Sequence, residues 1–250
     1  DQRRIDILVA GCGTGKQAID RAVGIRASQV LGIDLSLASL AFAKRKAVEL
    51  AIGNVEFKHA DLLNLHLLNR SFDMIECIGV LHHMQDPVRG WALLVEHLRP
   101  GGLIRIGLYS ETARRSIVAA QAFVAARGYG SSADGIRACR QDILATGSPE
   151  VGSASRIVDF YTTSECRDLL FHVSEKRFTL PAIGAILEEL GLRFVGFEFG
   201  DPLQTQRYVE RFPNDPTAMS LENWHRYEQE HPDTVIGLYL FSVQKPASGA

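Results

Sequence analysis

Three glycines at alternate positions, Gly11, Gly13 and Gly15, follow the apolar segment 5–10 near the start of the chain. An acidic residue, Asp34, closes the next apolar segment. Glycine has no Cβ, so a ligand can approach the backbone of such a loop closely. A carboxylate at the end of a neighbouring strand can accept hydrogen bonds from the two hydroxyls of a ribose. These residue types in this order predict a site for a nucleoside.

Two other kinds of glycine loop fit the segment poorly. A phosphate-binding P-loop needs glycine where this chain has Ala10, and serine or threonine where it has Gln17. The dinucleotide fingerprint G-x-G-x-x-G needs its third glycine at the position of Lys16. The spacing G-x-G-x-G therefore disfavours ATP hydrolysis and a dinucleotide cofactor, although an NAD- or nucleotide-dependent α/β enzyme stays open as an alternative.

Further motifs follow in a fixed order, and with them the chain resembles the class I S-adenosylmethionine-dependent methyltransferases. Segment 7–15 is similar to the first motif of that family, and segment 32–36 to the acidic end of its second strand. Residues 60–62 stand where the family places an acidic residue near the adenine amino group. Segment 72–83 is similar to its fourth strand and the turn after it, and segment 98–103 to the turn into its fifth. Several ordered motifs are far more specific than one glycine loop.

The resemblance implies S-adenosylmethionine as cofactor, S-adenosylhomocysteine as its product, and no metal. It assigns the ribose hydroxyls to Asp34, the adenine amino group to Asp61, and the neighbourhood of the methionine amino group to the backbone of 77–79. Two other roles stay open: Asp34 as a favourable charge at a helix N-terminus, and Asp61 as a loop cap. The implied cofactor-binding residues are Gly11, Cys12, Gly13, Thr14, Gly15, Asp34, Leu35, Asp61, Leu62, Cys77, Ile78 and Gly79.

Candidate catalytic residues follow the fourth and fifth predicted strands, because open α/β sheets bind ligands at the carboxyl ends of their strands. His82 and His83 come after the fourth strand, and Tyr109 ends the fifth. One histidine could act as a general base for an oxygen or nitrogen nucleophile. The interpretation we favour from the sequence alone is that one histidine packs and the other lines the site without transferring protons. No third ligand for a metal is evident beside the pair.

Short apolar segments alternate with helical patterns in the first half of the chain, which is typical of a parallel α/β sheet. Ser36 is a suitable N-cap and Gly53 a suitable stop for the second helix, and Asp86-Pro87 begins the third. The sequence predicts strands over 5–10, 29–34, 54–58, 72–78 and 102–109, and helices over 15–25, 36–52 and 87–98.

The pattern changes after residue 110. Segment 156–178 is rich in aromatic and polar residues and fits no single period, so we expect a lid that recognises substrate, with Tyr161, Arg167 and His172 as its contacts. Thr179 is a suitable N-cap for the helix that follows. The sequence predicts helices over 113–127, 134–145, 180–190, 203–212 and 220–230, a loop over 146–155, and strands over 192–199 and 235–243.

These elements predict a Rossmann-like, doubly wound α/β fold with a seven-stranded mixed sheet. In the family's topology the last strand is antiparallel, and here a helical lid would lie between the fifth and sixth strands. We expect an S-adenosylmethionine-binding core over 1–110, the inserted lid over 111–178, and the rest of the core over 179–250 with a small insert at 201–232.

Net charge, cysteine spacing and the distribution of apolar residues disfavour several classes of protein. A net charge of −2 gives the chain as a whole no character of a nucleic-acid-binding protein. No two of the four cysteines have a zinc-binding spacing, and no signal peptide or membrane-spanning run is evident, so a cytoplasmic location is the default. The family usually has a helix before its first strand, so we expect Asp1 to lie within a longer chain. Segment 163–181 resembles bacterial methyltransferase modules that are sometimes attached to tetratricopeptide repeats.

The sequence thus leads to methyl transfer from S-adenosylmethionine to an oxygen or nitrogen of an acceptor. The acceptor, a small molecule or a protein, stays open because recognition lies in variable insertions. The first alternative is a module that binds S-adenosylmethionine or S-adenosylhomocysteine without catalysis. The second is the NAD- or nucleotide-dependent enzyme considered above.

Overall fold

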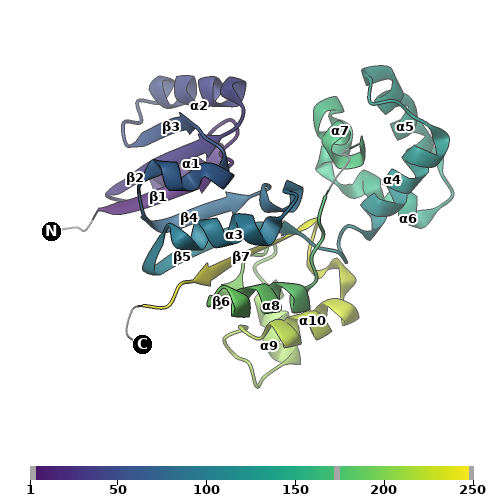
Figure 1. The fold of residues 1–250 in the computed structure, drawn as a ribbon. Coiled ribbons are helices and arrows are strands. Elements are labelled where there is room, and N and C mark those ends of the chain that lie inside the picture. Colours follow the sequence, from purple (N-terminus) through teal and green to yellow (C-terminus); the bar gives the residue numbers. More distant parts are fainter. Residues whose placement is uncertain (1–3, 172–174, 248–250) are drawn as a thin grey trace.

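The structure is a computed structural model that describes residues 4–171 and 175–247. Its centre is one seven-stranded sheet with the order β3-β2-β1-β4-β5-β7-β6 (Figure 1). The mixed, doubly wound sheet predicted from the sequence is therefore confirmed. The strands are β1 (Ile5–Ala10), β2 (Ser28–Asp34), β3 (Val55–His59), β4 (Phe72–Ile78), β5 (Leu98–Tyr109), β6 (Arg193–Phe197) and β7 (Leu238–Gln244).

Strand direction brings the predicted site residues to one edge of the sheet. β1 pairs in parallel with both β2 and β4, and β4 pairs in parallel with β5. β7 is antiparallel to β5 and to β6, as expected for the last strand. The glycine loop after β1, Asp34 at the end of β2 and the turn after β4 consequently meet at the carboxyl edge.

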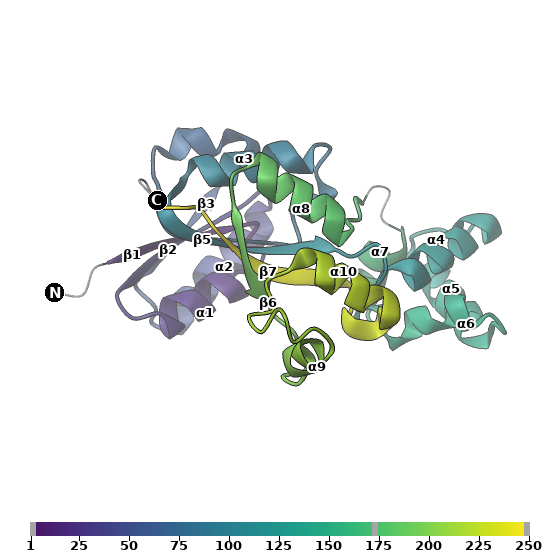
Figure 2. The same cartoon turned by 90° about the horizontal axis from the view of Figure 1, so that it is seen from below.

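Helices cover both faces of the sheet, as Figure 2 shows for α1 (Lys16–Gly24) and α2 (Leu37–Glu49) on one face and α3 (Pro87–Glu96) and α8 (Leu180–Glu189) on the other. Alternate residues of β1 serve the two layers. Ile7 and Val9 join the core cluster beneath α1, and Leu8 joins the cluster that contains Trp91 of α3. Successive side chains of a strand point to opposite faces of the sheet. A strand that is covered on both faces therefore needs apolar residues at consecutive positions, as β1 has.

Two predicted N-caps, Ser36 and Thr179, and the predicted start of the third helix at Asp86-Pro87 are confirmed. The Ser36 hydroxyl accepts a hydrogen bond from the backbone N–H of Ser39 at 3.2 Å. Asp86 accepts from the N–H of Arg89 at 3.0 Å, and Thr179 from that of Ala182 at 3.3 Å. A side-chain acceptor at this position satisfies a helix N–H that has no partner within the helix.

Several predicted boundaries are wrong. The second helix ends at Glu49, before Gly53, and the left-handed turn after it is made by Ala51 with φ 55°. The fifth strand begins earlier than predicted, at Leu98, because Leu98 pairs with Phe72 across a bulge. β6 is shorter than predicted and β7 is shifted toward the C-terminus, since its pairing with β5 begins at Leu238.

The chain between β5 and α8 forms a helical lobe with its own core. Figure 1 shows the lobe beyond one end of the sheet, opposite the end where both termini lie. Its helices are α4 (Arg115–Arg127), α5 (Ala133–Ala145), α6 (Pro149–Gly152) and α7 (Thr163–Phe171), with 3-10 turns η3 (Ser153–Arg156) and η4 (Val158–Tyr161). Its buried residues are Ile117, Ala120, Val124, Ile136, Cys139, Ile143, Ala154, Phe160, Cys166, Leu169 and Leu170.

Two expectations for this lobe are corrected. The predicted loop 146–155 contains α6, which begins after the N-cap Ser148, and most of η3. Segment 156–178 contains α7, whose buried residues Cys166, Leu169 and Leu170 do follow helical spacing. The period was hidden because α7 is short and is preceded by the irregular turn η4.

The remaining elements are two helices near the C-terminus and three 3-10 turns. The helices α9 (Gln204–Arg211) and α10 (Leu221–Glu230) lie between β6 and β7, close to the predicted ranges, and pack through stacked Tyr208 and Trp224. Within the described residues, no helix combines the length and the apolar character needed to cross a bilayer. The other 3-10 turns are η1 (Leu62–Leu68), η2 (Leu81–His83) and η5 (Pro232–Thr234).

Candidate functional site

All three glycines of the loop after β1 have backbone conformations that favour glycine. Their φ angles are 74° at Gly11, 52° at Gly13 and 87° at Gly15. A Cβ at Gly13 would meet no heavy atom within 4 Å, so this part of the loop faces open space. A Cβ at Gly15 would lie 2.5 Å from the Cβ of Ala43 on α2, so here the backbone itself packs against a helix.

This difference predicts unequal effects of two otherwise identical substitutions. Both Gly13→Ala and Gly15→Ala force a side chain into a left-handed conformation, at about 1–2 kcal/mol each. Gly15→Ala must also displace Ala43, and overpacking of this kind costs about 1–3 kcal/mol more. In urea unfolding, we therefore expect Gly15→Ala to be the less stable variant by that amount. Equal midpoints would show that α2 yields freely at this contact.

Asp34 is fixed at the mouth of the loop by two backbone hydrogen bonds. Its Oδ2 accepts from the N–H of Gly13 and its Oδ1 from the N–H of Ser36, both at 2.8 Å. Ser36 is the N-cap of α2, so the alternative role of Asp34 near a helix N-terminus coexists with its place beside the glycine loop. The carboxylate therefore ties the loop after β1 to the turn after β2.

A cavity of about 280 Å³ joins this carboxylate to other residues of the predicted cofactor site. Asp61 and Leu62 contribute from the turn after β3, and Gly79 from the turn after β4. The cavity is lined by Gly11, Ile33, Asp34, Leu35, Ala60, Asp61, Leu62, Gly79, Val80, His83 and Met84. Residues from four segments that are distant in sequence thus converge as the resemblance implies.

Asp61 has the capping role that the sequence left open, because its Oδ1 accepts a hydrogen bond from the N–H of Leu63 at 2.9 Å. The cap holds the carboxylate at the wall of the cavity and so leaves room for a ligand contact as well. Gly79 has φ 78°, and a Cβ there would meet nothing within 4 Å. Gly79 thus leaves open space in a cavity that also has two carboxylates in its wall, an arrangement that suits a nucleoside with an amino-acid tail.

The other predicted cofactor residues do not line this cavity. Cys12 and Cys77 are buried, and burial raises the pKa of each thiol to about 12, with the Asp34 charge contributing at Cys12. Neither sulfur is therefore an available nucleophile. Thr14 is exposed, and Ile78 lines a different, larger cavity.

Four lining residues escaped the sequence analysis: Ile33, Ala60, Val80 and Met84. Ile33, Ala60 and Val80 lie within the motif segments, and Met84 directly follows His83, so proximity in the chain was the available signal. Val80 packs closely on the glycine loop, since a Cβ at Gly11 would lie 2.1 Å from its Cγ2. Gly11 is thus needed for close packing between two loops as well as for its backbone conformation.

The two candidate histidines occupy different environments. His82 is fully buried, whereas His83 is exposed and lines the 280 Å³ cavity. The ring centroids of the two are 4.3 Å apart. The sequence-based interpretation that one histidine packs and the other lines the site therefore agrees with their places in the fold.

The ring of Tyr109 lies between His82 and an arginine. Its centroid is 3.6 Å from that of the His82 ring, and the two planes differ by 24°. The guanidinium carbon of Arg114 lies 3.7 Å from the same centroid. Two flat groups at these distances cannot share one face of a ring, so they lie on opposite faces. Burial raises the pKa of the Tyr109 phenol, an effect that the Arg114 cation opposes, so the phenol can donate a hydrogen bond at neutral pH.

Arg114 is in turn paired with a buried carboxylate. Its Nε and Nη2 donate to the two oxygens of Glu175 at 3.0 and 2.7 Å, and the side chains are 3% and 5% exposed. Sequence reasoning missed both residues. They belong to no motif, and 61 positions separate them in the chain, so no local pattern could have paired them.

The predicted substrate contacts do not converge on the cavity. Tyr161 is 61% exposed on the helical lobe, and the Nε of Arg167 donates to the carbonyl of Ser131 within that lobe. Neither residue lines the 280 Å³ cavity. His172 lies outside the described residues.

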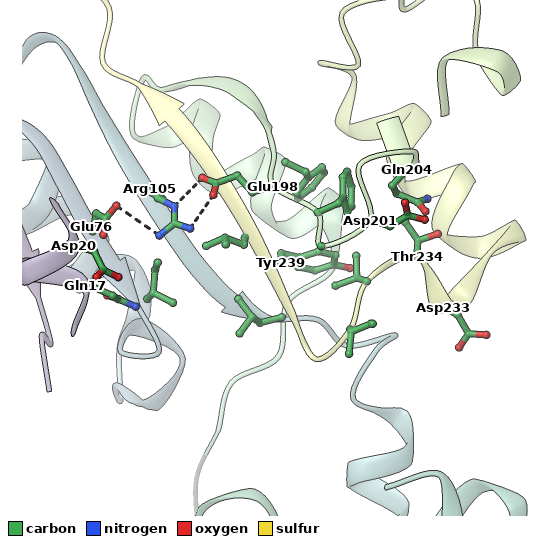
Figure 3. A pocket seen from close by; sticks show the side chains of 18 of the residues that line it. Gln17, Asp20, Glu76, Arg105, Glu198, Asp201, Gln204, Asp233, Thr234 and Tyr239 are labelled. Atoms are coloured by element: carbon green, nitrogen blue, oxygen red, sulfur yellow. Dashed lines mark hydrogen bonds and ion pairs between the residues drawn. The ribbon is translucent and has the colours of Figure 1, made fainter. Parts of the chain in front are cut away.

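A second cavity, of about 910 Å³, lies beside the first turn of α1, on the face of β4, β5 and β7 (Figure 3). Its polar floor is a chain of ion pairs in which Glu76 contacts Arg21 at 2.6 Å and Arg105 at 3.5 Å, and Arg105 pairs with Glu198 at 2.7 Å. Glu76 is fully buried, and its Oε2 has no hydrogen-bond partner among the described residues. Ile78 connects this cavity to the predicted cofactor residues.

Comparison with known proteins agrees with this geometry. Residues 7–102 match a family model described as a methyltransferase domain. The chain is 30% identical over 233 residues to an uncharacterized protein of Synechococcus sp., which covers 88% of this chain and 55% of that protein. It is 31% identical over 123 residues to phosphoethanolamine N-methyltransferase 1 of Arabidopsis thaliana, covering 49% of this chain and 25% of that enzyme.

A solved structure agrees over nearly the whole chain. PKMT2 from Rickettsia typhi in complex with AdoHcy superposes with a TM-score of 0.73 at 17% identity, covering 98% of this chain and 49% of that one. At this identity the likeness concerns the fold. The chain spans about half the length of the Synechococcus relative. The family match over residues 7–102, the sheet topology and the placement of the glycine loop with Asp34 agree, and this part of the chain is a methyltransferase domain of the class I, S-adenosylmethionine-dependent type.

Proposed function

We propose that this protein transfers a methyl group from S-adenosylmethionine to an oxygen or nitrogen atom of an acceptor. The observation that carries the proposal is the 280 Å³ cavity in which Asp34, Asp61 and the backbone of Gly11 and Gly79 converge. Two carboxylates fixed by backbone hydrogen bonds are suited to accept from ribose and adenine donors. An N-methyltransferase among the matched relatives supports a nitrogen acceptor as one of the two options.

Bound S-adenosylmethionine would supply an electrophilic methyl group on a sulfonium. The residues of the chain would bind and orient it: Asp34 at the ribose, Asp61 at the adenine, and the backbone near Gly79 at the methionine end. Alignment of the reacting atoms and exclusion of water are the main tasks in such a displacement. We assign the acceptor side to Tyr109 and the histidines, with His83 as the general base because it is the histidine at the cavity.

We further propose that the lobe 111–178 contributes to acceptor recognition. It lies beyond the end of the sheet toward which the parallel strands run (Figure 1). It has a core of its own, so its surface can vary without disturbing the cofactor site. Tyr161, exposed on this lobe, stays a candidate contact.

Calorimetry with S-adenosylmethionine and S-adenosylhomocysteine, with NADH and ATP as controls, tests the cofactor. Micromolar binding of the sulfonium compound and its product alone supports the proposal. Binding of NADH or ATP in their place would move the protein to the NAD- or nucleotide-dependent alternative. Methyl transfer is then screened with a labelled methyl donor against hydroxyl, carboxyl and amine compounds and against proteins. If the chain binds S-adenosylmethionine and S-adenosylhomocysteine but methylates nothing in this screen, it is a non-catalytic binding module.

Asp34→Ala should weaken S-adenosylhomocysteine binding by about 1.5–3 kcal/mol, the cost of losing charge-assisted hydrogen bonds to a ligand. In affinity this is roughly 10- to 150-fold. Asp34→Asn keeps one acceptor oxygen without the charge, so its affinity should fall between those of the parent and the alanine variant. Asp134→Ala, on the exposed surface of the lobe, is the control and should bind as the parent does. Unchanged affinity in Asp34→Ala would remove this residue from the site.

A further inference from the structure

The two ends of the helical lobe meet beside the candidate acceptor site. The chain leaves β5 at Ser110 and returns through residues 175–178, and a parallel bridge joins Ser110 to Phe178. The N–H of Phe178 donates to the carbonyl of Tyr109 at 2.9 Å, and the N–H of Lys176 donates to that of His82 at 2.7 Å. The returning segment is thus hydrogen-bonded to the end of β5 and to η2, the two places that carry the candidate catalytic residues.

The Arg114–Glu175 pair lies across these two ends. Arg114 precedes α4 on the outgoing segment, and Glu175 is on the returning one. Arg177 adds a second, longer contact to Glu175 at 3.8 Å. Two ions removed from water need good geometry to recover the desolvation cost, and the two parallel hydrogen bonds of this pair provide it.

The same guanidinium covers one face of the Tyr109 ring, while His82 covers the other. A cation over an aromatic face is attracted by the negative potential of that face. A planar guanidinium can stack on a ring and bind a carboxylate in the same plane, which a lysine ammonium cannot do. Glu175 therefore orients the group that holds Tyr109.

We infer that Arg114 and Glu175 are positioning residues, which hold the Tyr109 ring in one orientation and couple that orientation to the point where the lobe joins the core. The inference rests on the proposed function only for its catalytic consequence, since the position of the ring can be measured without turnover. Displacement of the lobe from the sheet would have to break a buried ion pair and release the ring.

Four variants test the inference: Arg114→Gln, Glu175→Gln, Arg114→Lys, and the exchange Arg114→Glu with Glu175→Arg. The readout is the NMR signal of the Tyr109 ring in protein with labelled tyrosine, assigned through Tyr109→Phe. The matched control is Arg211→Gln, which breaks an exposed pair of the same geometry with Glu230, at 2.8 Å for both hydrogen bonds.

We expect the ring signal of the parent to be displaced from the position of free tyrosine by the stacked His82. It should move toward that position in both glutamine variants and only part of the way in Arg114→Lys. The exchange should recover thermal stability but not the ring signal, because a carboxylate at position 114 is repelled by the ring face. Arg211→Gln should leave the signal unchanged.

Two results would overturn the inference. If the ring signal of Arg114→Gln coincides with that of the parent, the arginine does not hold the ring. If the exchange restores both stability and signal, the pair is a structural tie with no special relation to Tyr109. Should the glutamine variants fail to fold, Arg114→Lys and the exchange still decide between these outcomes.

Calorimetry with S-adenosylhomocysteine on the same samples keeps this test separate from that of the proposed function. Neither Arg114 nor Glu175 lines the cofactor cavity, so the affinity should stay within about two-fold of the parent. Once an acceptor is known, the turnover of Arg114→Gln and Glu175→Gln should fall by about 10²-fold relative to the parent, with the KM for the cofactor unchanged. A loss of this size is expected when a group at the reacting centre is misplaced. A parent that binds no S-adenosylhomocysteine would refute the proposed function and leave the ring measurement standing.

Discussion

Replacing His83 with glutamine should lower the rate of methyl transfer by about 10²–10⁴-fold, the usual contribution of a general base. His83 is exposed at the cavity shared by Asp34 and Gly79, where a proton from the acceptor could be received. Glutamine preserves polarity and approximate size but cannot take up a proton near neutral pH. The affinity for S-adenosylhomocysteine should therefore change little, by less than about three-fold.

The measurement is turnover at saturating cofactor with the acceptor found in the screen, together with calorimetry on the same variant. His66→Gln is the matched control, because His66 is exposed on η1 and lies outside this cavity. Near-normal turnover in His83→Gln would assign His83 to lining the site. A large loss of cofactor affinity with normal turnover at saturation would place it against the cofactor instead.

Breaking the Arg114–Glu175 pair should cost about 3–5 kcal/mol of unfolding free energy, because one partner is left as a buried, uncompensated charge. For a chain of this size, that lowers the melting temperature by roughly 6–20 °C. Both side chains are at most 5% exposed, so solvent screening does little to reduce the effect. Thermal unfolding of Arg114→Gln and Glu175→Gln measures it.

The exposed pair Arg211–Glu230 supplies the comparison. Its side chains are 46% and 39% exposed, and exposed pairs contribute about 1 kcal/mol or less. Arg211→Gln should therefore melt within about 4 °C of the parent. Replacing both buried partners with apolar residues, as in Arg114→Met with Glu175→Leu, should recover much of the loss, since no charge is then left buried. Similar melting temperatures for the exposed and buried single variants would contradict this account.

Part of the cavity that we propose for the cofactor was predictable from the sequence because its signals are local. A positive φ at Gly11, Gly13 and Gly15 is a requirement of a few consecutive residues, and the glycine spacing records it directly. The caps at Ser36 and Asp86 are similarly decided within one helical turn. Strand direction then follows from the alternation of strands and helices, which places the ends of parallel strands at one edge.

The element boundaries that were predicted wrongly also have physical causes. Gly53 was predicted to stop the second helix, but Ala51 takes the left-handed conformation before it is reached, since tertiary packing can outweigh backbone preference. The predicted loop 146–155 contains a helix of a single turn. So short an element has too few residues to show a hydrophobic period.

The sequence by itself determined the resemblance to the methyltransferase family, the fold class, and the glycine loop with Asp34, because each of these depends on patterns within short stretches of chain. Only the tertiary structure decided which histidine faces the cavity and which is buried, because that depends on the Tyr109 ring beside them. It also brought Arg114 to Glu175 across 61 positions. Such a contact is selected by the packing of two distant segments, and neither segment carries any local pattern that anticipates the other.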